Sequence, residues 1–139
     1  MAIDVEALIL NAKIGSERKA AQVETCGPFA AALYDVLCEL GLTPTIKTAA
    51  FHYLGSRAEW YHAVVELDGQ LFDSKGEFSH DIARKRLKLH PKVETRLDLK
   101  RDDRGSCYEE ELDVLHQFLV NELRKSARKQ IGLEAKKAA

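Results

Sequence analysis

The sequence lacks a long hydrophobic run, an even set of cysteines and a basic N-terminal segment. No apolar stretch in its 139 residues approaches the roughly 20 residues that a membrane-spanning helix needs, which argues against a transmembrane protein. Three cysteines form an odd number, which argues against a disulfide scaffold. The opening residues, Met1-Ala2-Ile3-Asp4, lack the basic region of a secretory signal peptide. We therefore expect a cytoplasmic protein with reduced thiols.

Internal repeats, low-complexity segments and linkers are also missing from the chain. With 45% hydrophobic and 31% charged residues, the chain can bury a core and is not typical of disordered or collagen-like proteins. Its length is close to the usual size of one domain, about 150 residues. The sequence therefore predicts a single domain over residues 1–139.

The net charge of −1 hides an uneven distribution. Residues 1–83 carry 6 Lys/Arg and 12 Asp/Glu, giving −6, whereas residues 84–139 carry 15 and 10, giving +5. Such a split indicates either a basic docking surface or simply solvated helices rich in Lys and Arg. Arg84, Lys85 and Arg86 are the candidates for contact with an acidic protein partner. Nucleic acid is not expected as a partner, because no aromatic residues interleave with the basic ones and the acidic half opposes non-specific binding.

Periodicity and turn residues predict helices, then antiparallel hairpins, then helices, which is the order of an α+β protein. Gly27-Pro28 is typical of a helix start, and a capping box over Ser106–Glu109 indicates another. Residues from Ile131 onward are expected to fray. The predicted helices cover residues 3–14, about 26–40, 79–90 and about 107–130, and the predicted strands cover residues 45–54, 60–67, 70–73 and 92–100.

Cys26 immediately precedes the predicted helix start. Free backbone N–H groups and the positive end of the helix dipole favour an anion there, so they lower the pKa of a thiol and produce the nucleophilic thiolate. The same N–H groups, including that of Gly27, could hold an oxyanion formed at a substrate carbonyl. Cys38, inside the helix, and Cys107, in a capping turn, lack such a setting and are expected to contribute to packing.

The Asp68-Gly69 pair predicts a two-residue hairpin that brings His62 and Asp73 together. With this loop, Val65 faces Phe72 and Val64 faces Asp73, so Asp73 lies on the same face as His62 and diagonal to it. A carboxylate in that position can fix the imidazole tautomer and stabilise the imidazolium. The alternate residues of the strand, from Tyr61 to Leu67, form an apolar face suited to the core. We therefore expect the polar pair on the opposite face, at the mouth of a cleft.

Three segments together resemble the core of transglutaminase-like proteins, within the papain-like cysteine superfamily. They are Thr25–Leu33 (TCGPFAAAL), Tyr61–Leu67 (YHAVVEL) and Gln70–Asp73 (QLFD), and the resemblance covers about residues 22–78. It implies N-terminal helices with the nucleophile helix packed on a small antiparallel sheet, followed by a C-terminal helix. It also implies that Cys26 is the nucleophile, His62 the general base and acid, and Asp73 the residue that orients the imidazole. The gap between Cys26 and His62 is far shorter than the roughly 130–150 residues of papain-type proteases, which indicates a compact member.

Two further residues are candidates near this core. Gln22, four residues before Cys26, is a candidate oxyanion donor, and Trp60, on the predicted face of His62, is a candidate for lining the acyl or acceptor site. The resulting expectation is a thiol hydrolase or acyltransferase acting on a protein or peptide-like amide, or an ester, without a cofactor.

Two other interpretations stay open. One is a binding module on the same fold, with the triad retained but idle. The other is a metal site drawn from Cys26, His52 and His62, although no CxxC, HxxxH or HExxH spacing supports a metal. The sequence therefore predicts no metal ligand.

Overall fold

A five-stranded antiparallel sheet with the order β4-β3-β2-β1-β5 carries the fold of the computed structural model, which describes residues 3–138. The strands are β1 (Thr45–Tyr53), β2 (Glu59–Leu67), β3 (Gln70–Asp73), β4 (Gly76–Phe78) and β5 (Thr95–Arg101). The helices are α1 (Val5–Asn11), α2 (Glu17–Val23), α3 (Cys26–Glu39), α4 (His80–Arg86), α5 (Arg104–Cys107) and α6 (Asp113–Ala138), with a short 3-10 turn at Glu110–Leu112.

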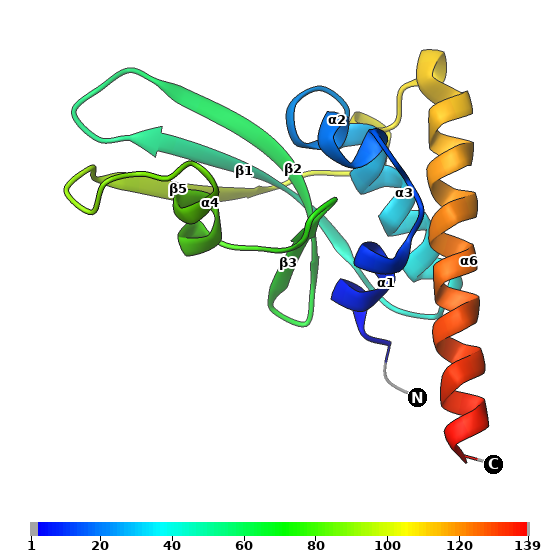
Figure 1. Cartoon of the computed structure of the whole chain (residues 1–139). Helices are drawn as coiled ribbons and strands as arrows, with labels where there is room; N and C mark the ends of the chain where they lie inside the picture. The colour runs from blue at the N-terminus through cyan, green and yellow to red at the C-terminus, as the bar shows by residue number, and fades with distance from the viewer. Residues whose placement is uncertain (1–2, 139) are drawn as a thin grey trace.

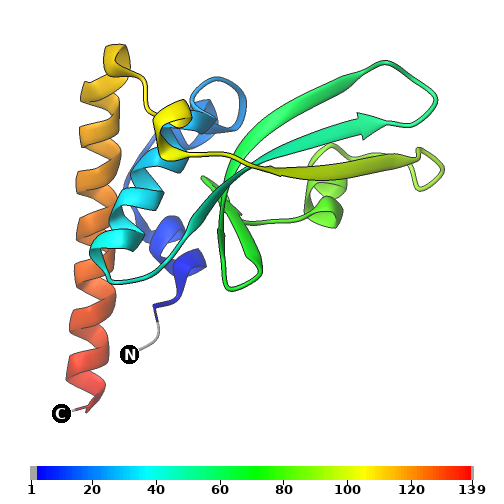
Figure 2. The same ribbon diagram turned by 180° about the vertical axis from the view of Figure 1, so that it is seen from behind.

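The helices are divided between the two ends of the sheet. Helices α1, α2 and α3 gather beside the long helix α6, while the β1–β2 hairpin and β5 extend away from them (Figures 1 and 2). Helix α4 lies beside this extension, away from the other helices (Figure 1). The sheet is therefore covered by α1, α2, α3 and α6 at one end and by α4 at the other (Figures 1 and 2).

Helix α3 buries one continuous apolar stripe. Phe29, Leu33, Val36 and Leu37 are all buried, and their spacing places them on the same side of a helix with 3.6 residues per turn. They belong to the larger core cluster, which also takes in Leu123 and other residues of α6, and residues of α1 and of the sheet. Full burial of each such side chain contributes about 1.5–3 kcal/mol, so this stripe fixes the helix that begins at Cys26.

A second, smaller core lies on the other face of the sheet. Its buried members come from β1, β2, β4 and α4, and Trp60 and Leu97 pack against it from the margin. They are Ala49, Phe51, Val64, Phe78 and Ala83. Both faces of the sheet are therefore partly covered.

The structure confirms the predicted α+β class and the predicted hairpin register. Leu67 pairs with Gln70 and Val65 with Phe72. Asp68 and Gly69 both have positive φ, 52° and 81°, as the two central residues of a type I′ turn require. Within residues 3–138, no helix is long and apolar enough to cross a membrane.

Several predicted boundaries are wrong. Helix α2 and strand β4 were not predicted, and α4 ends at Arg86, short of residue 90. Ser106 does not cap the last helix as predicted, because the Asp103 carboxylate accepts from the Ser106 N–H at 2.7 Å and caps a separate short helix, α5. The last helix therefore begins later, at Asp113. Helix α6 then continues to Ala138, beyond the predicted start of fraying.

Candidate active site

Cys26 is the first residue of helix α3, with its thiol half-buried. Burial raises the pKa of this thiol, but hydrogen bonding and charge interaction with His62, together with the backbone N–H groups of Ala63 and Gly27, outweigh it and lower the pKa below its ordinary value. The predicted setting at a helix start is therefore present, with an added contribution from the strand that carries His62.

His62 lies on β2 and is only 4% exposed. Its Nε2–H donates to Asp73 Oδ2 at 3.0 Å, which leaves Nδ1 as the ring nitrogen available to the Cys26 thiol. Burial lowers the pKa of His62, but Asp73 and Cys26 together raise it to about 9. Both pKa shifts therefore have the direction that favours an imidazolium beside a thiolate.

Asp73 is 1% exposed and accepts hydrogen bonds from three residues. Besides His62, the donors are Arg86, whose two terminal nitrogens lie 2.6 and 3.3 Å from the carboxylate oxygens, and the Lys75 N–H at 2.9 Å. Burial raises the pKa of Asp73, but His62 and Arg86 lower it below its ordinary value. Asp73 is thus an ionised carboxylate, and every group that contacts it there is a donor.

Arg86 is the main site residue that sequence reasoning assigned elsewhere. It was expected to face an acidic partner, but it is half-buried and also donates to the Glu77 carbonyl at 3.1 Å. Arg84 likewise donates hydrogen bonds within the chain, to the Val93 carbonyl at 2.6 Å and to the Thr95 hydroxyl at 2.6 Å. Of the three basic residues, only Lys85 is exposed. Contact of this surface with an acidic partner stays a prediction.

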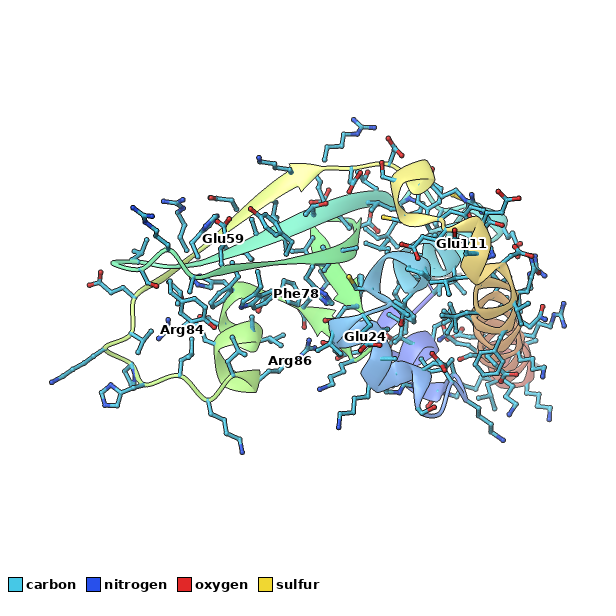
Figure 3. The ribbon with its side chains drawn as sticks, turned by 90° about the horizontal axis from the view of Figure 1, so that it is seen from above. Glu24, Glu59, Phe78, Arg84, Arg86 and Glu111 are labelled. Atoms are coloured by element: carbon cyan, nitrogen blue, oxygen red, sulfur yellow. The ribbon has the colours of Figure 1, made fainter. Side chains whose placement is uncertain are left out.

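His62 lines a pocket, in keeping with the predicted position beside a cleft, but the polar pair is more deeply buried than the sequence predicts. His62 and Asp73 are buried, and the neighbouring Val64 on the same face is fully buried as well. Strand β4 and helix α4 cover this face, with Phe78 5.4 Å from the His62 ring. Tyr61, assigned to the apolar core face, is instead 60% exposed. Phe78 and Arg86 both lie between α4 and the N-terminal helices (Figure 3).

Gln22 lies near the pair but its amide is already engaged. Its Nε2 donates to Ser74 Oγ at 2.7 Å, and its Oε1 accepts from Arg86 at 3.3 Å. Helix α2, which was not predicted, positions it one turn before Cys26. These contacts position the side chain of Gln22 against Arg86. The role of Gln22 as an oxyanion donor stays a prediction.

The predicted roles of Gly27 as an oxyanion donor and of Trp60 in lining the acyl or acceptor site stay predictions. A Cβ on Gly27 would lie 3.2 Å from the Cys107 carbonyl oxygen, so a glycine allows α5 to approach the start of α3. Trp60 stacks on Phe51 with ring centroids 4.7 Å apart and presents an edge-to-face contact to His62 at 6.4 Å. Trp60 is therefore held rigidly beside the imidazole.

His52 does not join Cys26 and His62. Strand pairing sets His52 opposite Glu59 and Ala49 opposite His62, so the two histidines lie on opposite faces of the sheet. His52 instead contacts Glu59 at 3.0 Å and Asp98 at 3.2 Å. In the part of the chain that the structure describes, residues 3–138, no group of three His, Cys, Asp or Glu side chains is arranged to hold a metal ion.

Comparison with known proteins supplies no relative from which a function could be transferred. The chain matches no protein-family model, no curated protein and no solved structure.

Proposed function

We propose that this protein is a cysteine-dependent acyl-transfer enzyme that acts on an amide or ester through Cys26, His62 and Asp73. The observation that carries the proposal is a set of three neighbouring groups: the half-buried Cys26 thiol, the His62 imidazole that lowers the pKa of this thiol, and the buried Asp73 carboxylate, whose Oδ2 is 3.0 Å from His62 Nε2. These groups interact in the order that nucleophilic catalysis needs: nucleophile, base, and the group that orients the base. The resemblance to transglutaminase-like proteins is consistent with it.

The first half-reaction forms an acyl-enzyme. The Cys26 thiolate attacks the carbonyl carbon, and a C–S bond forms while the carbonyl π electrons move onto oxygen. Backbone N–H groups at the start of α3 hold that oxyanion. As the intermediate collapses, the C–N or C–O bond breaks and the His62 imidazolium gives its Nδ1 proton to the leaving group.

The second half-reaction restores the enzyme. Neutral His62 accepts a proton from water or from an acceptor amine, which attacks the thioester carbon. The C–S bond then breaks, the thiolate returns and His62 is again an imidazolium. Asp73, held by Arg86, keeps Nε2 protonated throughout, so that Nδ1 always faces the reacting proton.

Thiol alkylation tests the activated pair directly, because the protein carries its own controls. Cys38 is exposed and Cys107 is buried. Burial is the main reason why the pKa of Cys107 is raised to about 11. Access alone therefore predicts that iodoacetamide labels Cys38 fastest. The proposed pair predicts that Cys26 is labelled faster than Cys38 at about pH 6, where an ordinary thiol is protonated.

His62→Gln supplies the matched variant. It should remove the advantage of Cys26 over Cys38 at about pH 6 while leaving the labelling of Cys38 unchanged. A burst of nitrophenol from p-nitrophenyl acetate, present in the native chain and lost in Cys26→Ser, would then demonstrate the acyl-enzyme. Labelling of Cys26 that is slower than that of Cys38 at every pH would favour the alternative, a binding module with an idle triad.

A further inference from the structure

A pocket of about 400 Å³ adjoins the catalytic cluster on the side of His62. Its wall includes His62, while Cys26 does not line it. The aromatic rings of Trp60 and Phe78 face it, and both are held in place, since Phe78 is buried and Trp60 is stacked on Phe51. The pocket is therefore a pre-formed, partly aromatic site beside the proton donor.

Exposed apolar side chains also line this pocket. They are Val23, 76% exposed at the end of α2, Tyr61, 60% exposed on β2, and Leu87, 42% exposed at the end of α4. Single exposed apolar residues are ordinary on protein surfaces. Three of them, from three separate elements and around one pocket, are typical of a binding surface for an apolar group.

The position of His62 indicates which part of a substrate the pocket takes. In the proposed reaction the carbonyl carbon bonds to Cys26, and His62 gives its proton to the departing group. A pocket lined by the proton donor, and not by the nucleophile, therefore adjoins the leaving-group side of the scissile bond. By microscopic reversibility, the same pocket holds an amine that attacks the acyl-enzyme.

The charges around the pocket disfavour a basic occupant. The residues that line it include the cations Lys75 and Arg86 and no carboxylate. The charge of Arg86 is opposed by Asp73. Lys75 is exposed and forms no ion pair within residues 3–138, so it leaves a positive charge at the pocket. Glu24, next along the chain from Val23, does not line the pocket.

We infer that this pocket binds a large, uncharged apolar group on the leaving-group side of the substrate, and that it disfavours lysine-like amines. The inference rests on the proposed function, because it takes His62 as the proton donor. It implies that the acyl-enzyme is resolved by water or by an apolar amine, and not by the side chain of a protein lysine.

Partition of the acyl-enzyme between water and added amines tests the inference. The native chain is acylated with p-nitrophenyl acetate at about pH 8, and acetyl transfer to glycinamide, leucinamide or lysinamide is measured against hydrolysis. Leucinamide should exceed glycinamide by about tenfold or more, the smallest factor that burial of a leucine-sized side chain produces. Lysinamide should gain nothing over glycinamide, despite its long aliphatic stem.

Pocket variants are compared through the ratio of aminolysis to hydrolysis, which is independent of the acylation rate. Val23→Ser and Leu87→Ser should each reduce the leucinamide preference several-fold. Leu54→Ser is the matched control, since Leu54 is also exposed but does not line the pocket, and it should leave the ratio unchanged. Lys75→Glu should raise the lysinamide ratio several-fold, and added salt should weaken that gain because the charge is exposed.

Failure of the pocket and failure of the proposed function give different results. A nitrophenol burst that depends on Cys26, with equal partition to all three amines, would overturn the pocket inference alone. If no burst occurs, the proposed function fails, and labelling by N-benzyl iodoacetamide decides the pocket. If N-benzyl iodoacetamide labels Cys26 faster than iodoacetamide does, and if Leu87→Ser removes this advantage and Cys38 does not show it, the result would support the pocket. Equal labelling rates of Cys26 by the two reagents would refute it.

Discussion

Replacement of Asp73 by Asn should uncouple the thiol from the imidazole with little change in side-chain volume. All groups that contact the Asp73 carboxylate are donors, from His62, Arg86 and Lys75. An Asn amide is neutral and keeps only one acceptor oxygen, so its NH2 group faces donors whichever way the amide is turned. The imidazolium of His62 then loses the negative charge that stabilises it, and His62 becomes a weaker acceptor for the proton of the thiol.

The magnitude follows from the pKa of His62. The rise from 6.5 to about 9 corresponds to about 3 kcal/mol in favour of the imidazolium, shared between Asp73 and Cys26. Loss of the Asp73 share should therefore lower the thiolate–imidazolium population by about 10–100-fold. The iodoacetamide labelling rate of Cys26 at about pH 6 should fall by the same factor, and its pH profile should move to higher pH.

Glu59→Gln is the control for this variant, because Glu59 also pairs with a histidine, His52, on the opposite face of the sheet. It should leave the labelling of Cys26 unchanged. Circular dichroism and urea unfolding establish that both variants fold, since loss of a charged partner of Arg86 also costs stability. A folded Asp73→Asn protein whose labelling profile for Cys26 superimposes on that of the native chain would refute the reasoning.

Three further changes test the fold and the site. Cys26→Ser removes the titration of the thiol and its share of the raised His62 pKa, while Asp73 still raises that pKa. In this variant His62 should stabilise the fold fully below about pH 6.5 and lose this contribution as the pH rises through its folded pKa. Asp73 should stabilise the fold above about pH 4 and lose its contribution as the pH falls through its lowered folded pKa, so urea midpoints across pH would show a plateau between these limits. Gly69→Ala should cost about 1–2 kcal/mol in urea unfolding, because its φ of 81° strains a residue with a Cβ; a neutral effect would contradict the assigned turn. His116→Ala should cost about 1–3 kcal/mol through its lost hydrogen bond to Asp35, with unchanged labelling of Cys26, and a drop in that labelling would show that the two regions are coupled.

The parts of the site that could be predicted depend on local geometry. The two-residue turn at Asp68-Gly69 fixes the register of β2 and β3, and the register alone determines that His62 and Asp73 share a face. Cys26 was placed by the helix-start signal in the residues that follow it. In each case the residues that determine the geometry lie close together in the sequence, so the local pattern limits the structure to one arrangement.

The parts that could not be predicted depend on contacts between distant segments. A buried carboxylate needs a cationic partner, but the sequence offers 21 Lys/Arg residues and no local rule selects Arg86. Its role depends on how α4 folds back over β4, and β4 itself is too short to give a period-2 pattern. Competing caps produced the other error, since Asp103 and Ser106 are both good helix caps and only tertiary packing decides between them.

A second cluster of His, Asp and Arg shows what distinguishes the candidate site. Asp35 on α3 accepts from both Arg104 nitrogens at 2.9 Å and from His116 Nε2 at 2.8 Å. The charges resemble those around His62, although the Asp35 side chain is 23% exposed and that of Asp73 only 1%. The remaining ring nitrogen of His116, Nδ1, is buried with no hydrogen-bond partner among the described residues. Its aromatic neighbour Tyr108 lies edge-to-face at 5.2 Å. Such a cluster can tie α3, α5 and α6 together without any chemistry. A paired histidine is therefore insufficient as a sign of catalysis in this fold. The thiol that interacts with His62, and the pocket beside that histidine, are the features that a purely structural cluster does not need.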